Sequence, residues 1–345
     1  MESTLCSIEA LVNIFEGISL RMKLYDCIVV GGGPAGVTAA IYLKNAEKNI
    51  LLISESAIGG KVLETFEIKN IPGFVSISGE EFGNKLENQL IELGVQVEYS
   101  KVTHIDFNNN IFSVICGEDT FESKSVVLAL GTNPRLLGVP VMIEDGDGTR
   151  EWGQQEDCTE RDFIGDFIHT CALCDGVFYK DKTVAVVGGG NSAITEAIYL
   201  SSICKKVVLV QNLKILTADK SLISILNSKS NIEIYLDQKI ESFNKHSGGE
   251  IEIKVENDES KFVDGVFISI GSVPNTDILK GKQWVCVDDS GYIMVTDKME
   301  STCEVDGAFA AGDCTNTPVK QITTACAQGT IAAKSAIEYL NKRDN

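Results

Sequence analysis

Histidine and basic residues are scarce in this sequence of 345 residues. It has three histidines, and its 30 Lys and Arg face 49 Asp and Glu, which gives a formal net charge of −19. Such an acidic chain repels polyanions, so we expect neither nucleic acid nor a membrane surface as a partner. No uninterrupted apolar run approaches the roughly 18 residues of a membrane-spanning helix. The first 22 residues carry no early basic cluster or small-residue cleavage site, so we expect no secretory signal.

Cysteine is present without the pattern of a disulfide framework. The eleven cysteines are an odd number and are scattered, which favours a reducing, cytoplasmic location. One pair, Cys171 and Cys174, has C-x2-C spacing, which allows a reversible disulfide and often lowers a cysteine pKa. Asp175 directly follows as a candidate proton donor and acceptor. The alternatives are half of a zinc site or two buried structural cysteines. A structural zinc needs four ligands, and no second C-x2-C occurs, so we predict no metal site.

The N-terminal part carries a dinucleotide-binding pattern. A buried strand over 24–30 is followed by Gly31-Gly-Gly-Pro-Ala-Gly36, a small-residue helix, a second strand over 50–54 and then Glu55. The glycines allow a tight turn and let the backbone approach a pyrophosphate at the helix N-terminus, while Glu55 can bind ribose hydroxyls. Gly-Pro-Ala-Gly within the turn is more typical of flavin than of nicotinamide sites.

A second pattern of this kind follows the cysteine pair. The strand over 183–187 leads into Gly188-Gly-Gly-Asn-Ser-Ala193, then a helix to about Leu200 and a strand over 206–210. Near the C-terminus a strand ends at Asp313, and Lys320-Gln321-Ile322 opens a helix that runs to Leu340. We therefore predict an α/β fold with two Rossmann-like, three-layer nucleotide-binding domains.

Two segments carry no assigned chemistry. Residues 1–22 predict a short amphipathic helix, an N-terminal extension that we expect only to pack. Residues 141–166 hold nine acidic residues against Arg150 and Arg161. This composition favours a solvated loop over a partner-contact segment.

In combination, these motifs resemble the low-molecular-weight thioredoxin reductases, flavoproteins of two Rossmann domains, over about residues 23–341. The resemblance rests on the two glycine turns, Gly59-Gly60, Asn70-x-Pro72-Gly73, the Cys171–Gly176 segment and Ala311-Gly312-Asp313. It implies FAD in a discontinuous domain of 23–133 and 267–345. It also implies an inserted domain, 134–266, that carries the redox disulfide and normally binds NADPH, and a homodimer.

The resemblance also implies residue roles. Cys174 is the sulfur facing the flavin, Cys171 attacks the disulfide of a thioredoxin-like protein, and Asp175 is the proton shuttle. The implied FAD contacts are Gly31, Gly33, Pro34, Ala35, Gly36, Glu55, Gly60, Lys61, Asn70, Val102, Gly131, Asp313, Lys320, Gln321 and Ile322.

Three departures from the family pattern stand out. Lys61 replaces a glutamine, and the acidic segment 141–166 is longer than the pattern predicts. The arginines that clamp the 2′-phosphate of NADPH are replaced by Gln211-Asn212-Leu213 and Thr217, with only Lys214 nearby. A phosphate would lose charge-assisted hydrogen bonds worth roughly 1.5–3 kcal/mol each. No acidic residue ends this strand to bind the ribose of NADH either.

The missing arginines favour a different electron donor. The chain is similar in this respect to the branch of the family that takes electrons from ferredoxin, one at a time. Ferredoxins are usually acidic, so docking here requires a local basic patch. The alternatives are an NADH- or NADPH-dependent thioredoxin reductase, an FAD-dependent dithiol oxidase, and a non-catalytic flavin redox sensor. Leu173 mildly favours the oxidase, whereas Asp175-Gly176 favours the reductase.

Overall fold

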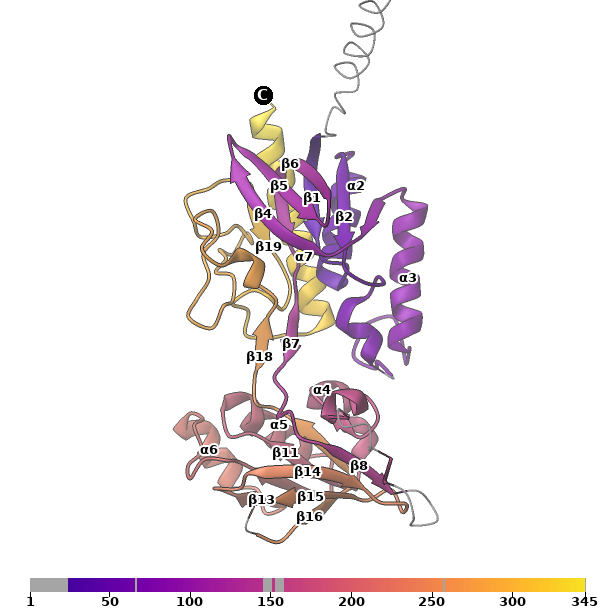
Figure 1. The fold of residues 1–345 in the computed structure, drawn as a ribbon, viewed down its shortest axis with the longest axis vertical. Coiled ribbons are helices and arrows are strands. Elements are labelled where there is room, and N and C mark those ends of the chain that lie inside the picture. The colour runs from indigo at the N-terminus through magenta and orange to yellow at the C-terminus, as the bar shows by residue number, and fades with distance from the viewer. Residues whose placement is uncertain (1–23, 66, 145–150, 153–157, 257, 345) are drawn as a thin grey trace, which may run out of the picture.

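The computed structural model describes residues 24–65, 67–144, 151–152, 158–256 and 258–344. The helix predicted over 1–22 lies outside these residues. Two bodies are stacked along the long axis of the molecule and are joined by the antiparallel strands β7 (Thr132–Pro134) and β18 (Ser272–Pro274), as Figure 1 shows.

The first body is built on a seven-stranded sheet of order β3-β2-β1-β6-β5-β4, with β19 beside β6. Its strands are β1 (Leu24–Val30), β2 (Ile50–Ser54), β3 (Gln96–Tyr99), β4 (Val102–Asn108), β5 (Ile111–Cys116), β6 (Asp119–Leu128) and β19 (Ala308–Ala310). Helices α2 (Pro34–Asn45), α3 (Gly79–Glu92) and α7 (Ile322–Arg343) complete it. Because β19 pairs with β6 in parallel, the N-terminal and C-terminal segments share one core.

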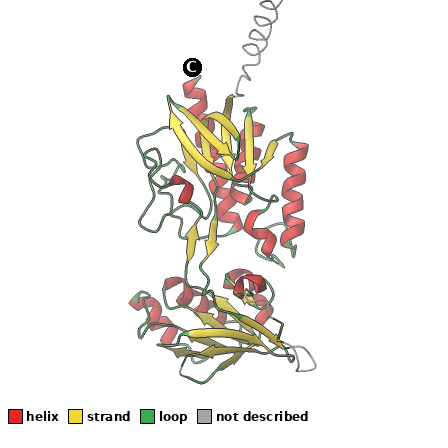
Figure 2. Cartoon of the chain, viewed as in Figure 1, coloured by secondary structure: helices red, strands yellow, loops and turns green. Residues whose placement is uncertain are grey.

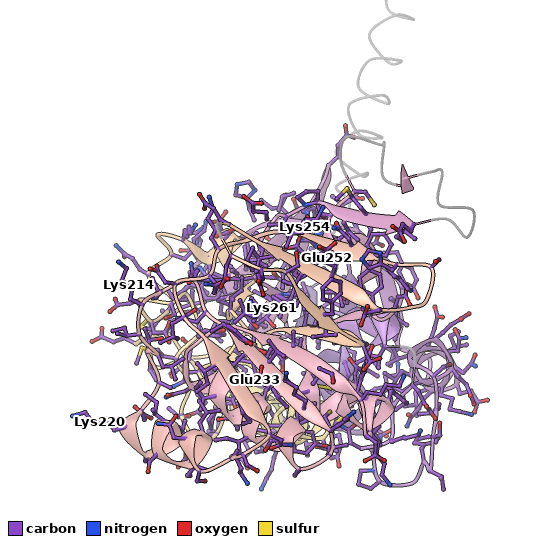
Figure 3. All side chains as sticks on the ribbon, turned by 90° about the horizontal axis from the view of Figure 1, so that it is seen from below. Lys214, Lys220, Glu233, Glu252, Lys254 and Lys261 are labelled. Carbon is purple, nitrogen blue, oxygen red and sulfur yellow. A yellow bond between two sulfur atoms is a disulfide. The ribbon has the colours of Figure 1, made fainter. Side chains whose placement is uncertain are left out.

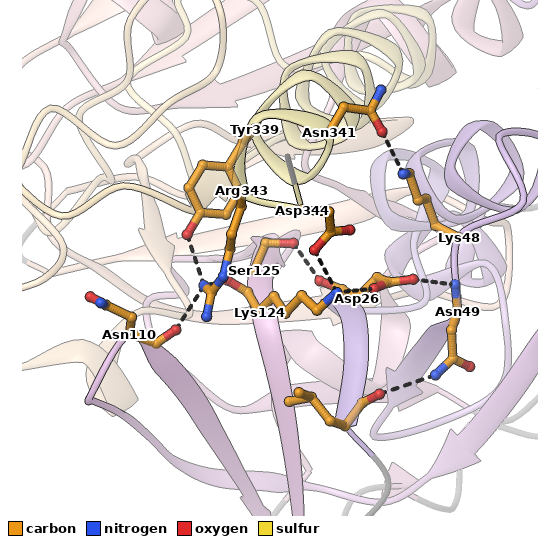
Figure 4. Close-up of polar contacts among 11 residues, drawn as sticks. Asp26, Lys48, Asn49, Asn110, Lys124, Ser125, Tyr339, Asn341, Arg343 and Asp344 are labelled. Atoms are coloured by element: carbon orange, nitrogen blue, oxygen red, sulfur yellow. Dashed lines mark hydrogen bonds and ion pairs between the residues drawn. The ribbon is translucent and has the colours of Figure 1, made fainter.

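Small residues let α7 lie directly against α2 in this body. A Cβ at Gly329 would come within 2.2 Å of the Ala35 carbonyl oxygen, so only glycine permits this approach. The end of α7 is fixed by polar contacts to the first strands (Figure 4). Lys124 bridges Asp26 at 3.0 Å and Asp344 at 2.9 Å, and Arg343 donates to the Asn110 carbonyl at 2.8 Å.

The second body contains two five-stranded sheets, with helices α5 (Asn191–Ser201) and α6 (Lys220–Asn227) on one side (Figure 2). The parallel sheet, in spatial order, consists of β10 (Ile168–His169), β17 (Gly265–Ile268), β11 (Thr183–Val187), β12 (Lys206–Val210) and β13 (Ile232–Tyr235). The other consists of β16 (Lys261–Val263), β15 (Ile251–Val255), β14 (Ile240–Lys245), β8 (Val141–Glu144) and β9 (Glu151–Trp152). Their apolar faces form one buried cluster between the sheets. Strand β17 runs two residues beyond the predicted boundary at 266, and the domain boundaries stay predictions.

The solvated-loop interpretation of 141–166 holds only in part, because Glu144, Asp162 and Asp166 are exposed but the described residues are not all loop and not all solvated. Residues Val141–Glu144 form β8, and Glu160 is fully buried in the short helix η2 (Glu160–Phe163). The Glu160 carboxylate accepts hydrogen bonds from the backbone N–H groups of Gly138 at 2.7 Å and Val139 at 2.9 Å. Acidic composition misled the prediction because this carboxylate satisfies buried backbone donors instead of facing water. Residues 145–150 and 153–157 lie outside the described part.

The structure also contains a disulfide that the sequence did not indicate. Cys286 and Cys303 are bonded, with their Cα atoms 5.5 Å apart. Among the described residues, no helix is long and apolar enough to cross a membrane.

Candidate redox and flavin-binding site

The C-x2-C segment forms a closed disulfide at the start of a single helical turn. Cys171 and Cys174 are bonded, with Cα atoms 5.3 Å apart, and Cys171 precedes α4 (Ala172–Asp175). The Cys174 N–H donates to Cys171 Sγ at 3.2 Å. Since the two sulfurs bond to each other, neither is a zinc ligand in this state. Helix α4 lies at the face of the second body that points toward the first (Figure 1).

Residues of the first body meet this disulfide. Gln321 is the residue at the N-cap position of α7, and its Nε2 lies 3.8 Å from Cys171 Sγ. Asn70 Nδ2 donates to Gln321 Oε1 at 3.0 Å, which fixes the Gln321 amide. Three of the predicted site residues, far apart in sequence, therefore lie together. The contact to α7 is made through Cys171, whereas the resemblance places Cys174 toward the flavin, and the two roles stay predictions.

Two lysines flank Asp313 beside these residues. Lys61, in η1 (Gly60–Glu64), places Nζ 3.7 Å from Asp313 Oδ2 and 3.4 Å from Thr132 Oγ1. Lys320 donates to the Asp313 carbonyl oxygen at 2.6 Å and lies over the Tyr292 ring. Burial lowers the pKa of Lys320, because the charged ammonium loses water there.

The first glycine turn fits a dinucleotide. Gly31 has φ +117°, and a Cβ on it would lie 2.1 Å from the Ala129 carbonyl oxygen. A Cβ on Gly33 would meet nothing within 4 Å, so the backbone there is open to a ligand. Pro34 begins α2 and no side chain caps this helix, which leaves its N-terminal N–H groups available to an anion such as a pyrophosphate.

The remaining predicted contacts have different surroundings. Glu55 is exposed just after β2 and pairs with Lys101 at 2.7 Å. Gly131 has φ +65° and open space around it. The Val102 side chain is buried in the core of the first body, so any contact with a cofactor falls to its backbone. Ile322 packs against a small apolar cluster that contains Ile68.

The second glycine turn lacks the cations of a phosphate clamp. Gln211 is buried, and its side chain covers Gly189, where a Cβ would lie 2.4 Å from Gln211 Nε2. Thr217 N–H donates to the Gly189 carbonyl at 2.8 Å. Lys214 is 83% exposed in its side chain and lies 3.6 Å from Asp237. Lys214 projects outward near one edge of the body, as does Lys220 (Figure 3).

Sequence reasoning missed a polar group behind the disulfide. His169, a buried residue of β10, lies 3.0 Å from Asp175 Oδ2 through Nδ1 and 2.7 Å from the Tyr179 hydroxyl through Nε2. Glu196 on α5 accepts hydrogen bonds from the Ser269 hydroxyl and the Ala172 backbone, and burial raises its pKa. A histidine two residues before a C-x2-C was the available signal.

Comparison with known proteins places the chain in a family. The model of the pyridine nucleotide-disulphide oxidoreductase family matches residues 25–329, so the chain belongs to this family. A thioredoxin reductase of Buchnera aphidicola subsp. Acyrthosiphon pisum is 36% identical over 335 residues, covering 93% of this chain and 98% of that protein. One from Peptoclostridium acidaminophilum is 34% identical, covering 92% and 98%.

A solved structure agrees. The thioredoxin reductase of Streptococcus pyogenes matches with a TM-score of 0.81 and 31% identity, covering 93% of this chain and 99% of that one. The resemblance to the low-molecular-weight thioredoxin reductases and the two-Rossmann α/β fold are confirmed. Reductases of this kind are FAD-binding flavoproteins, and FAD is the cofactor here.

Proposed function

We propose that this chain is an FAD-dependent thioredoxin reductase with ferredoxin as its favoured electron donor. Electrons would pass to the Cys171–Cys174 disulfide and on to the disulfide of a thioredoxin-like protein. The observation that carries the proposal is the position of this disulfide against Gln321, at the start of the helix that closes the flavin-binding body. The family relationship supports the same reaction.

The chain's own residues perform the thiol–disulfide exchange. Bound FAD would supply two electrons, which together with two protons convert the disulfide to two thiols. Cys171, as thiolate, then attacks the substrate disulfide and forms a mixed disulfide, and the released substrate sulfur takes up a proton. Cys174 attacks Cys171 Sγ, which restores the internal disulfide and releases the second substrate thiol. Asp175, one residue beyond Cys174, would accept and return the protons.

Apolar side chains beside the disulfide suit a protein substrate. Leu173, between the two cysteines, is 52% exposed, and Val177, three residues after Cys174, is 44% exposed. Exposed apolar groups around a reactive disulfide favour a protein over a small polar thiol as the partner. A homodimer and a cytoplasmic location complete the proposal, as expectations from the family and from the cysteine pattern.

The donor assignment rests on charge. A 2′-phosphate at the second glycine turn would meet the neutral side chains of Gln211, Asn212 and Thr217, with Lys214 paired to Asp237 at the surface. Without charge-assisted hydrogen bonds, NADPH should bind weakly. A one-electron protein donor needs no such clamp.

A nicotinamide donor is the second candidate. The second glycine turn keeps its backbone form, with φ +132° at Gly188, and the relatives from Buchnera aphidicola and Peptoclostridium acidaminophilum are thioredoxin reductases. Gln211 or Asn212 could bind the ribose of NADH in place of an acidic residue. A conventional reductase of this kind would use the same disulfide and the same substrate.

Anaerobic titration with a dithiol tests the proposed electron path. Added dithiol should bleach the flavin of the wild type in proportion to the amount of dithiol added, whereas the Cys174→Ser substitution should block the bleaching. The reduced wild type should then reduce a thioredoxin disulfide. A flavin that stays oxidised after dithiol is added would instead indicate a redox sensor. Rapid oxygen consumption with dithiol, without thioredoxin reduction, would indicate a dithiol oxidase.

A further inference from the structure

We propose that His169 is a positioning residue that holds Asp175 for proton transfer to and from the redox thiols, in a hydrogen-bonded chain that ends at Tyr179. The inference rests on the proposed function, because it assigns a residue to the exchange reaction. It concerns a histidine that the sequence motifs did not include.

Both ring nitrogens of His169 are engaged. Nδ1 lies 3.0 Å from Asp175 Oδ2, and Nε2 lies 2.7 Å from the Tyr179 hydroxyl oxygen. A neutral imidazole has one donor and one acceptor nitrogen. An ionised Asp175 only accepts, so Nδ1 carries the proton and Nε2 accepts from the Tyr179 O–H. In this hydrogen-bonded series, Tyr179 therefore donates to His169, and His169 donates to Asp175.

Tyr179 is suited to remain the donor. Burial raises the pKa of its hydroxyl, and the carboxylates of Asp166, Asp175 and Asp264 raise it further. The phenol therefore keeps its proton over the working pH range. A protonated Tyr179 favours the Nδ1–H form of His169, so the hydrogen bond from His169 to Asp175 is maintained. This matters because Asp175 directly follows Cys174, one of the two cysteines that change redox state.

The surrounding core fixes the ring in this orientation. His169 stacks on Phe267 with centroids 5.1 Å apart, and Tyr179 meets Phe267 edge-on at 5.6 Å. Gly265 makes room for Tyr179, since a Cβ at this position would lie 2.2 Å from its ring. A histidine that only filled space would not need both of these polar partners.

Other charged groups face the hydrogen-bonded residues Tyr179, His169 and Asp175 from the neighbouring elements. Asp166 precedes β10, Asp264 precedes β17, Lys182 lies over the Tyr179 ring at 5.5 Å, and Glu196 faces α4 from α5. The His169 bond engages Oδ2 of Asp175, and the proposal assigns proton exchange with the thiols to the other carboxylate oxygen, Oδ1. Losing this bond frees the carboxylate to rotate and slows exchange without changing either cysteine.

The exchange half-reaction tests this role without ferredoxin or a nicotinamide as electron donor. The holoenzyme is reduced with dithiothreitol, desalted anaerobically and mixed with the aromatic disulfide DTNB across pH. His169→Phe keeps the ring volume and the stacking on Phe267 but removes both hydrogen bonds. His169→Asn keeps a donor near the Nδ1 position. The control is His104→Asn, which changes an exposed histidine of the first body.

His169→Phe should slow exchange by about tenfold or more, the cost of a lost hydrogen bond to a charged group. His169→Asn should recover most of the rate, and His104→Asn should match the wild type. A Phe variant as fast as the wild type, or an Asn variant as slow as Phe, would overturn the role. Failure of the wild type itself to react would count against the proposed function instead.

NMR of ¹⁵N-histidine-labelled wild type gives a second readout that does not depend on the folding of a His169 variant. The three histidines can be assigned with His104→Asn and His246→Asn. The proposal expects His169 as the neutral Nδ1–H tautomer in the oxidised enzyme. An Nε2–H tautomer or a charged imidazole near neutral pH would contradict it, whether or not thioredoxin is reduced.

Discussion

Restoring two arginines at the second glycine turn should convert this chain into an efficient NADPH enzyme. The double variant Asn212→Arg/Thr217→Arg changes two exposed side chains. It removes only a 3.3 Å contact from the Thr217 hydroxyl to the Gly189 carbonyl, while the backbone bond between the same residues at 2.8 Å remains. The fold of the turn should therefore survive the change.

The expected gain follows from two new hydrogen bonds to a phosphate. At roughly 1.5–3 kcal/mol each, they sum to about 3–6 kcal/mol, or roughly a hundredfold to ten-thousandfold in affinity. The assay is the KM for NADPH and for NADH in flavin reduction. The NADPH value should fall, and the NADH value should change little.

Asn227→Arg, at the exposed end of α6, is the matched control for added charge. It should leave both KM values unchanged. A wild type already saturated by micromolar NADPH, or a double variant that gains nothing over the control, would refute the reasoning from charge.

Three further predictions concern stability. Glu160→Gln puts an NH₂ donor in place of one of the two carboxylate oxygens that accept hydrogen bonds from buried backbone N–H groups. It should lower the free energy of unfolding, measured with urea, by about 2 kcal/mol. Glu118→Gln, at an exposed position, should lower it by almost nothing. Burial raises the pKa of Glu196, so its stabilisation is fully present below the ordinary glutamate pKa and is lost as pH rises through the folded pKa. The stability of Glu196→Gln should therefore fall less than that of the wild type as pH rises above the ordinary glutamate value. The Cys286–Cys303 bond closes a loop with a sequence separation of 17, so Cys286→Ser should lower the free energy of unfolding by about 3 kcal/mol without reductant and by nothing with it. Equal losses of unfolding free energy for Glu160→Gln and Glu118→Gln would contradict the first prediction. Parallel curves of stability against pH for Glu196→Gln and the wild type would contradict the second. A loss of stability in Cys286→Ser that persists in reductant would contradict the third.

Local patterns were enough to predict most of the architecture. The strands over 50–54 and 206–210 match β2 and β12 in both bounds, because buried parallel strands are continuous apolar runs. The glycine turns were predictable because Gly31 needs a positive φ and Gly36 allows no side chain, with a Cβ only 1.9 Å from the Gly31 carbonyl oxygen. Such requirements act between near neighbours in sequence.

What sequence reasoning missed depends on long-range contacts. The acidity of 141–166 gave no sign that Glu160 would turn inward, because its partners, Gly138 and Val139, are backbone groups without a residue signature. The pairing of Cys286 with Cys303 depends on how two loops fold together. The partners of His169 lie within ten residues, yet only the tertiary packing on Phe267 shows that both ring nitrogens are used.

Anaerobic stopped-flow measurement of flavin bleaching tests the donor assignment most directly. The wild type is mixed in parallel with NADPH, NADH and reduced ferredoxin, and each reaction is followed into reduction of a thioredoxin disulfide. Ferredoxin should bleach the flavin rapidly, and both nicotinamides should do so slowly and only at high concentration. Rapid bleaching by micromolar NADPH, with ferredoxin inert, would contradict the account.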